Sequence, residues 1–128
     1  MGEAGILGSC RIFVVEDEYV IAETLCEALR EDGATIVHVE GWLDAAEAFL
    51  REHASEINCA IVDVNLHGVP SYPVVDLMIE RGIYVVLLTG FGREAIQEAY
   101  RSLPRCQKPF DQQAVNSILT DGIAQGRI

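Results

Sequence analysis

Three short, uninterrupted apolar runs with β-branched members limit the fold of this chain more than any other feature. They cover Ile12–Val15, Cys59–Val62 and Val85–Leu88. Runs of this kind are typical of strands that are buried on both faces, as in a parallel sheet covered by helices. Parallel neighbours need crossover connections, and helices are the usual crossovers. The runs therefore predict an α/β fold with a parallel sheet at its centre.

Segments with helical periodicity alternate with the apolar runs. The first has apolar positions from Val20 to Leu29 and ends at Asp32-Gly33, where glycine can take the left-handed conformation that follows a last helical turn. Pro73 suits the first turn of a later helix, and Asp111 can cap the last one. In total five strands alternating with five helices are predicted, the helices at residues 20–29, 43–53, 73–80, 94–100 and 114–123, and two shorter strands at 35–39 and around 105–106.

Length, charge and cysteine usage restrict the class of protein. The 128 residues fit a single domain, 1–128, with a core from about residue 10 to residue 125. No apolar run approaches the roughly 20 residues that span a bilayer, and no signal peptide is evident, so we expect no membrane contact and a cytoplasmic location. A formal charge of −11 argues against direct binding of nucleic acid. The four cysteines lack paired metal-type spacing and are expected to be buried free thiols.

Polar groups follow four of the predicted strands. Glu16 and Asp17 come after the first strand, Asp63 after the third, Thr89 after the fourth and Lys108 after the fifth. In open α/β sheets, ligands bind beyond the carboxyl ends of the strands, near the point where the strand order reverses. We therefore expect these side chains to line one crevice.

Three carboxylates in one crevice indicate a metal site. They repel one another by roughly 1 kcal/mol per pair at about 4 Å in water, and by about four times that at an effective dielectric near 20. Lys108 alone cannot neutralise them, whereas a hard divalent cation can, and an all-oxygen set suits Mg²⁺. Asp17 and Asp63 are predicted as direct ligands, Glu16 as a ligand through water, and the main-chain carbonyl of Asn65 as a further oxygen.

Asp63 is the predicted nucleophile of this site. With the metal in place, its free carboxylate oxygen can attack a phosphoryl group and form an aspartyl phosphate. Lys108 and the metal would hold the incoming charge, because phosphoryl transfer depends mainly on positioning and charge stabilisation. The Thr89 hydroxyl and the Gly90 amide would then bind the attached phosphate and draw their loop inward, which would be the signal.

The ordered set of an acidic pair, Asp63, Thr89 and Lys108-Pro109 resembles the receiver domains of two-component response regulators, over residues 11–124. The resemblance implies a flavodoxin-like, doubly wound sheet in strand order 2-1-3-4-5 and a cis peptide before Pro109. It also implies a stand-alone signalling switch rather than an enzyme that turns over a substrate. The phosphoryl donor would be a histidine kinase or a histidine phosphotransfer protein, and a downstream protein partner would read the result.

Two stretches further resemble the single-domain receivers that carry a Phe-Ala-Thr-Gly motif. These stretches are Thr89-Gly90-Phe91-Gly92 and Lys108-Pro109-Phe110, although Leu87 and Leu88 stand where that motif has Phe and Ala.

The chain departs from the family pattern at three further places. Glu16 stands where Asp is more common, and Arg105 stands where an aromatic side chain usually rotates inward on activation. Gly90 replaces the common Ala and has no Cβ to restrain the backbone, so we predict a more mobile loop and a short-lived phosphoryl state.

Other functions fit parts of the pattern. A haloacid dehalogenase-like phosphatase also combines an Asp nucleophile with Thr, Lys and Mg²⁺, but its general acid lies two residues after the nucleophile, where this chain has Asn65. A receiver-shaped interaction module that works without phosphorylation, or a flavodoxin-like cofactor binder, remains a third alternative, since fold does not decide function. The sequence leaves open the kinase, the downstream target and the oligomeric state.

Overall fold

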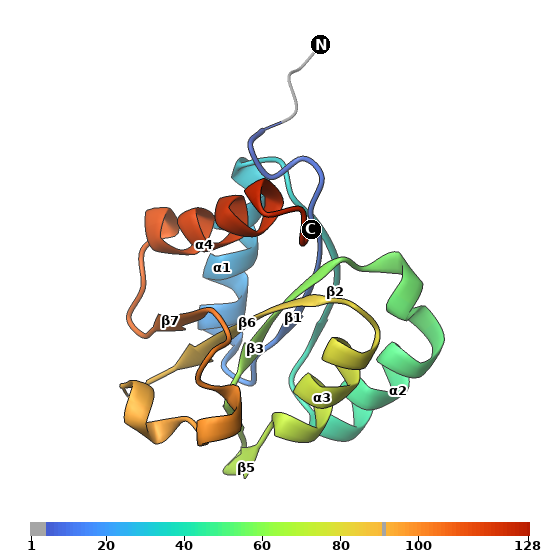
Figure 1. Cartoon of the computed structure of the whole chain (residues 1–128), viewed down its shortest axis with the longest axis vertical. Coiled ribbons are helices and arrows are strands. Elements are labelled where there is room, and N and C mark those ends of the chain that lie inside the picture. The colour runs from blue at the N-terminus through green and yellow to red at the C-terminus, as the bar shows by residue number, and fades with distance from the viewer. Residues whose placement is uncertain (1–4, 91) are drawn as a thin grey trace.

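A computed structural model describes residues 5–90 and 92–128 and has a five-stranded sheet between two helical layers (Figure 1). Along the chain the elements are β1 (Arg11–Val15), α1 (Tyr19–Glu31), β2 (Thr35–Glu40), α2 (Leu43–His53), η1 (Ala54–Glu56), β3 (Cys59–Asp63), β4 (Asn65–Leu66), β5 (Val69–Pro70), α3 (Tyr72–Glu80), β6 (Tyr84–Thr89), η2 (Arg93–Ala95), η3 (Glu98–Tyr100), β7 (Arg105–Gln107) and α4 (Gln112–Ala124).

The sheet strands are all parallel and lie in the order β2-β1-β3-β6-β7. This is the predicted order 2-1-3-4-5, and it reverses between β1 and β3. The register keeps the strand ends level there, because Val15 lies opposite Val62 and Asp63 lies opposite Leu88. The carboxyl ends of the central strands therefore meet at one edge, at the topological switch point where ligands bind in such sheets.

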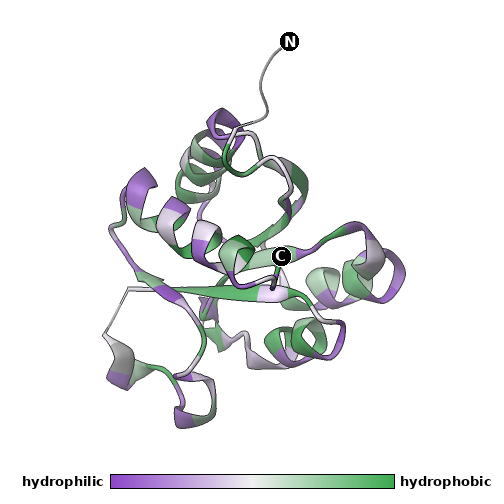
Figure 2. Ribbon diagram, turned by 45° about the horizontal axis from the view of Figure 1, so that its top comes forward, coloured by the Kyte–Doolittle hydropathy of each residue, from purple (hydrophilic) through white to green (hydrophobic). Residues whose placement is uncertain are grey.

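Two separate apolar layers hold the helices on the sheet. α2 and α3 cover one face and α1 and α4 the other (Figure 1). Successive strand residues alternate between the layers: Phe13 and Val15 belong to the first, Ile12 and Val14 to the second. Every residue of β3 and β6 is buried. Figure 2 shows a largely hydrophobic sheet between helices that are hydrophobic on one side and hydrophilic on the other. This double burial explains why the runs show no polar alternation.

The predicted helix ends are confirmed by their backbone and capping contacts. Gly33 has φ 97° directly after α1, a conformation that glycine adopts without steric cost. The Asp111 carboxylate accepts a hydrogen bond from the Ala114 N–H at 2.8 Å at the start of α4. Pro73 lies in the first turn of α3, and the peptide bond before Pro109 is cis.

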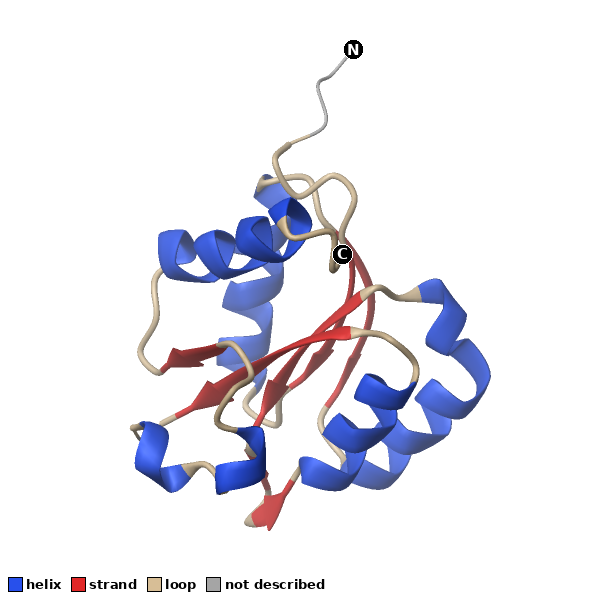
Figure 3. Cartoon of the chain, in the orientation of Figure 1, coloured by secondary structure: helices blue, strands red, loops and turns tan. Residues whose placement is uncertain are grey.

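The predicted helix at 94–100 is wrong. This stretch forms two 3₁₀ turns, η2 and η3, so the described residues contain four α-helices instead of five (Figure 3). Of its apolar residues only Ile96 is fully buried, and a short helix without a buried apolar face gains too little from packing to persist. The Arg101 guanidinium instead bonds the carbonyl oxygens of Ile96, at 2.8 Å, and Glu94, at 3.1 Å.

The structure also bears on the sequence predictions for the cysteines and for membrane-spanning segments. All four cysteines are buried free thiols, as predicted. None of the described helices is both long and apolar enough to cross a membrane. Phe91, part of the predicted loop motif after Thr89, lies outside the described residues.

Candidate functional site

Asp63 lies at the carboxyl edge of the sheet as the last residue of β3. Its side chain is buried, with only 9% exposed. One carboxylate oxygen, Oδ1, accepts a hydrogen bond from the Asn65 N–H at 3.0 Å, and the other, Oδ2, accepts one from Lys108 Nζ at 2.8 Å. The two bonds fix the orientation of the carboxylate at this edge of the sheet.

Lys108 joins Asp63 to a second buried carboxylate. Its Nζ lies 2.7 Å from Glu16 Oε1, and the Glu16 side chain is fully buried. The ammonium approaches that oxygen outside hydrogen-bond geometry, and no other described donor reaches it, so Oε1 has a counter-charge without a hydrogen bond. Oε2 accepts a hydrogen bond from the Glu18 N–H at 3.1 Å. A main-chain bond from the Lys108 N–H to the Thr89 carbonyl, 2.7 Å long, holds the lysine beside the end of β6.

The charges of this cluster do not balance. Burial raises the pKa of Glu16 to about 7, against the opposing effect of the Lys108 ammonium. Burial also opposes the charged form of Lys108, but contacts with Asp63 and Glu16 outweigh it and raise the pKa of the lysine. The site thus contains more carboxylate than ammonium, which is the electrostatic setting in which a divalent cation binds.

Asp17 follows Glu16 in the loop between β1 and α1. Its Oδ2 accepts a hydrogen bond from the His67 N–H at 2.9 Å; burial opposes the charged form, but this bond and the Glu16 contact lower the pKa of Asp17. His67 has φ 50°, and its ring stacks on Trp42 with centroids 3.7 Å apart. A short hairpin of β4 and β5, with His67 in its turn, therefore reaches back to the acidic loop after β1.

Three acidic residues in a row could hold a metal. One carboxylate oxygen from each of Glu16, Asp17 and Glu18 lies within 4.8 Å of the other two. Such an all-oxygen set suits Mg²⁺. Asn65, whose carbonyl was predicted as a ligand, lies at the exposed start of β4 and pairs with Pro70, which has no N–H to donate to that carbonyl.

The structure brings the predicted site residues to one edge of the sheet. Thr89 is buried at the end of β6, and Gly90 follows it in an exposed position, where no atom of the described residues other than its chain neighbours lies within 4 Å of the place a Cβ would take. Arg105, which replaces the usual aromatic residue, is exposed on the edge strand β7.

Sequence reasoning missed two residues that belong to this neighbourhood. Glu18 lies 3.9 Å from Lys108 Nζ and shares the acidic cluster; the third position of the acidic triplet was the signal for it. Ser71 is fully buried, and its hydroxyl donates to the Asp63 main-chain carbonyl at 2.6 Å. Serine before a helix usually caps it, so nothing in the sequence distinguished this contact from a cap.

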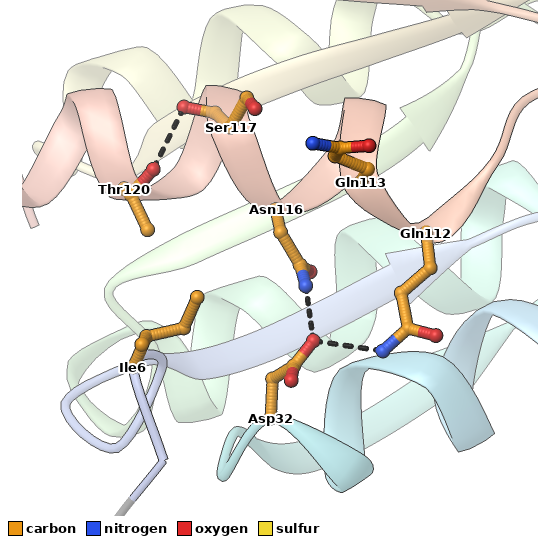
Figure 4. A pocket seen from close by; sticks show the side chains of 7 residues that line it. All are labelled: Ile6, Asp32, Gln112, Gln113, Asn116, Ser117 and Thr120. Atoms are coloured by element: carbon orange, nitrogen blue, oxygen red, sulfur yellow. Dashed lines mark hydrogen bonds between the residues drawn. The ribbon is translucent and has the colours of Figure 1, made fainter.

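A polar hollow of about 450 Å³ lies elsewhere, between the end of α1 and α4 (Figure 4). The Asp32 carboxylate there accepts hydrogen bonds from the side-chain amides of Gln112, at 2.8 Å, and Asn116. These amides already satisfy the carboxylate oxygen, and the hollow shares no residue with the Asp63 crevice. It ties α1 to α4 and supplies no candidate for phosphoryl chemistry.

The fold and the crevice define the class: a doubly wound α/β protein with a lysine-bridged carboxylate site at its topological switch point. No family model and no curated protein sequence matches the chain, so similarity to solved structures carries the comparison. That similarity is decisive, and the chain belongs to the response regulator receiver domains.

Two solved structures of 30% identity or more carry this assignment, and two more distant ones share the fold. SdrG from Sphingomonas melonis Fr1 is 34% identical over 86% of this chain and 92% of that chain, with a TM-score of 0.75. The BeF₃-activated conformation of SdrG, from Pseudomonas melonis Fr1, is 30% identical over 99% of this chain and 100% of that chain, with a TM-score of 0.73. The receiver (REC) domain of the PhyR response regulator from Erythrobacter litoralis is 21% identical over 94% of each chain, with a TM-score of 0.78. A chain of the CheX–CheY–BeF₃–Mg²⁺ complex from Borrelia burgdorferi is 14% identical over 89% of each chain, with a TM-score of 0.79.

Proposed function

We propose that this chain is a stand-alone receiver that accepts a phosphoryl group on Asp63 with Mg²⁺ and signals by a change of conformation. The observation that carries the proposal is the Lys108 ammonium, which lies 2.8 Å from Asp63 and 2.7 Å from Glu16 in a buried cluster with an excess of carboxylate. A surface lysine would not need two buried partners, and burying two carboxylates beside one ammonium is costly for a group without a further role.

Each residue of the crevice has a part in the transfer. A bond forms between a carboxylate oxygen of Asp63 and phosphorus while the bond from phosphorus to the donor's nitrogen breaks, and that nitrogen leaves with the electron pair. Asp63 is oriented for this by the Asn65 N–H. Lys108 can move its ammonium from the carboxylates to the oxygens of the phosphoryl group, which keeps the positive charge where negative charge develops. Thr89 and the Gly90 N–H, at the end of β6, would bind the attached phosphate.

A metal would complete the site. When bound, Mg²⁺ would compensate the carboxylates and the phosphoryl oxygens together. Asp17 and Asp63 are suited to bind it directly, Glu16 through water, and the carbonyl of Asn65 offers a further oxygen. Glu18 belongs to the same acidic cluster and is an additional candidate.

Partners follow from the proposed chemistry. The donor would be a phosphohistidine of a kinase or of a phosphotransfer protein, in the cytoplasm, and a downstream protein would recognise the phosphorylated form. The chain would catalyse its own phosphorylation and dephosphorylation without being an enzyme for another substrate. SdrG has a BeF₃-activated conformation and CheY forms a complex with CheX, BeF₃ and Mg²⁺, which makes beryllium fluoride a suitable probe for this chain.

The direct test is to incubate the full chain with Mg²⁺ and phosphoramidate and to measure its intact mass. One phosphoryl adduct that is stable in acid and lost in base is expected for the wild type, and no adduct for Asp63→Asn. Asp121→Asn, on the exposed side of α4, is the matched control and should be phosphorylated normally. An adduct that survives Asp63→Asn would overturn the proposal, and steady release of phosphate from a phosphomonoester would indicate a phosphatase instead.

A further inference from the structure

The chain lacks the aromatic side chain on β7 that would couple the site to its surface, because Arg105 is exposed there. A different aromatic pair stands between the Asp63 loop and the segment after β6. Tyr72 begins α3, directly after the Asp63 loop, and Tyr100 ends η3. Their rings stack with centroids 4.3 Å apart and an interplanar angle of 16°.

At the Asp63 end, Ser71 connects the strand to α3. Its hydroxyl donates to the Asp63 carbonyl at 2.6 Å, and its N–H donates to the Val64 carbonyl at 2.9 Å. The Ser71 carbonyl in turn accepts the first helical bond of α3, from the Val74 N–H at 3.0 Å. Ser71 is fully buried, so a shift of the Asp63 backbone is passed to the start of α3 and hence to Tyr72.

At the other end, Tyr72 holds the segment 92–101. Its hydroxyl oxygen accepts a hydrogen bond from the Gln97 N–H at 3.0 Å, and Tyr72 as a whole is only 7% exposed. The Tyr100 hydroxyl donates to Asp76 Oδ1 on α3 at 2.8 Å. Two hydrogen bonds and one ring stack therefore join the 3₁₀ turns to α3.

The segment 92–101 is cross-linked within itself. The Arg101 guanidinium bonds the carbonyls of both Ile96 and Glu94 and so links the two 3₁₀ turns. Ile96 is buried in the same apolar layer as Val62 and Val85 and anchors the unit to the sheet. The unit begins two residues after Gly90, so it is connected to the phosphate-binding loop at its start and to the Asp63 loop through Tyr72.

We propose that Tyr72 and Tyr100 couple the state of the Asp63 site to the segment 92–101, whose rearrangement presents the signal on the surface. The inference rests on the proposed function, because phosphorylation supplies the change that is transmitted. Tyr72 and Tyr100 are coupling residues and do not touch the phosphoryl group. Loss of either contact would leave the site able to bind its ligand but would weaken the response of the segment.

The test uses the full chain with Mg²⁺ and beryllium fluoride as the phosphoaspartate mimic. Binding is followed by the fluorescence of Trp42, the one tryptophan of the chain, which stacks on His67 beside Asp17. The response of the segment is followed by ¹H–¹⁵N NMR shifts of the Gln97, Glu98 and Arg101 amides. Tyr72→Phe keeps the ring and removes only the hydroxyl. In this variant the amide shift changes caused by beryllium fluoride should fall to about half or less of the wild-type values. The midpoint of beryllium fluoride binding, measured by Trp42 fluorescence, should stay within about twofold of the wild-type midpoint.

Two further variants complete the design. Tyr100→Phe removes only the bond to Asp76 and should also reduce the response of the segment. Tyr84→Phe is the matched control, because its hydroxyl bonds the Ile118 carbonyl at 3.1 Å on the other layer, and it should respond as the wild type does. Thermal unfolding of each variant establishes that it is folded.

Each outcome has a distinct meaning. A wild-type chain that neither binds beryllium fluoride by fluorescence nor forms the phosphoryl adduct would overturn the proposed function. A wild-type chain that binds it without shifts at Gln97–Arg101, or Tyr72→Phe and Tyr100→Phe chains that respond fully, would overturn the coupling alone.

Discussion

Raising the pH from 5 to 8 should destabilise the metal-free protein through Glu16. The carboxyl has an ordinary pKa of 4.5, and burial raises the pKa to about 7 in the folded state. Between these values the folded state binds more protons than the unfolded state, so the free energy of unfolding falls as the pH rises. The contribution is fully present below pH 4.5 and is lost above about pH 7. Asp17, whose pKa is lowered, acts in the opposite sense and at pH values below its ordinary 3.8, outside this window.

The magnitude follows from the size of the pKa change. A difference of about 2.5 pKa units corresponds to about 3 to 4 kcal/mol at most, since each unit is worth about 1.4 kcal/mol. Because some of the contribution is already lost at pH 5, the expected fall between pH 5 and pH 8 is about 2 to 3 kcal/mol. That is a large part of the roughly 5–15 kcal/mol of a typical domain.

Urea unfolding in the presence of EDTA, followed by far-UV circular dichroism, measures this effect at several pH values. Glu16→Gln carries no titratable group at this position and should show a pH dependence that is flatter by about 2 to 3 kcal/mol. Glu23→Gln, an exposed residue of α1, is the matched control and should behave as the wild type. Saturating Mg²⁺ should restore more stability at pH 8 than at pH 5, because protons compete with the metal for Glu16. Equal pH slopes for the wild type and Glu16→Gln would refute the reasoning.

Two glycine substitutions test other parts of the fold. Gly122→Ala places a Cβ 2.8 Å from two atoms of the Tyr84 ring and 3.0 Å from Ile128 Cδ1. The variant should be less stable than the wild type, because an overpacking cost of about 1–3 kcal/mol outweighs the helix-propensity gain of about 1 kcal/mol. A urea midpoint above that of the wild type would contradict this. Gly90→Ala places its Cβ in open space, so stability should change by less than about 0.5 kcal/mol. The same substitution should slow dephosphorylation, measured by the decay of the phosphoryl adduct, because it restrains the loop backbone; an unchanged decay rate would argue against loop mobility as the cause.

The apolar runs and their polar ends made most of the fold and the crevice predictable. Ile12–Val15, Cys59–Val62 and Val85–Leu88 are all buried strands, since two covered faces leave no reason for alternation. The carboxyl ends of parallel strands lie at the same edge of a sheet, so the topology alone predicted that Asp63, Thr89 and Lys108 would lie close together. The sequence could not indicate that Lys108 would contact Glu16 as well as Asp63, because that depends on side-chain geometry across three strands.

Two segments were beyond the reach of sequence patterns. No pattern indicated the pairing of β4 with β5, which is accompanied by a hydrogen bond from the His67 N–H to Asp17, a residue 50 positions earlier in the chain. At 94–100 the apolar spacing favoured a helix, whereas contacts from Tyr72 and Arg101 compete for the backbone groups that a helix would use. Tertiary contacts overrode a weak local preference there.

The sheet also separates two hydrophobic layers that pack independently of each other. The layer under α2 and α3 and the layer under α1 and α4 share no buried residue, although Leu87 and Leu88 are neighbours in the chain and face opposite ways. Substitutions in different layers have no common partners, so their effects on stability should add. One layer can therefore accumulate changes, by drift or by design, while the other stays as it is. Glu16 and Asp63, which Lys108 bridges, lie at the ends of strands that both layers share. Substitutions in either layer that displace these strands would also displace the site, and this limits how far each layer can change.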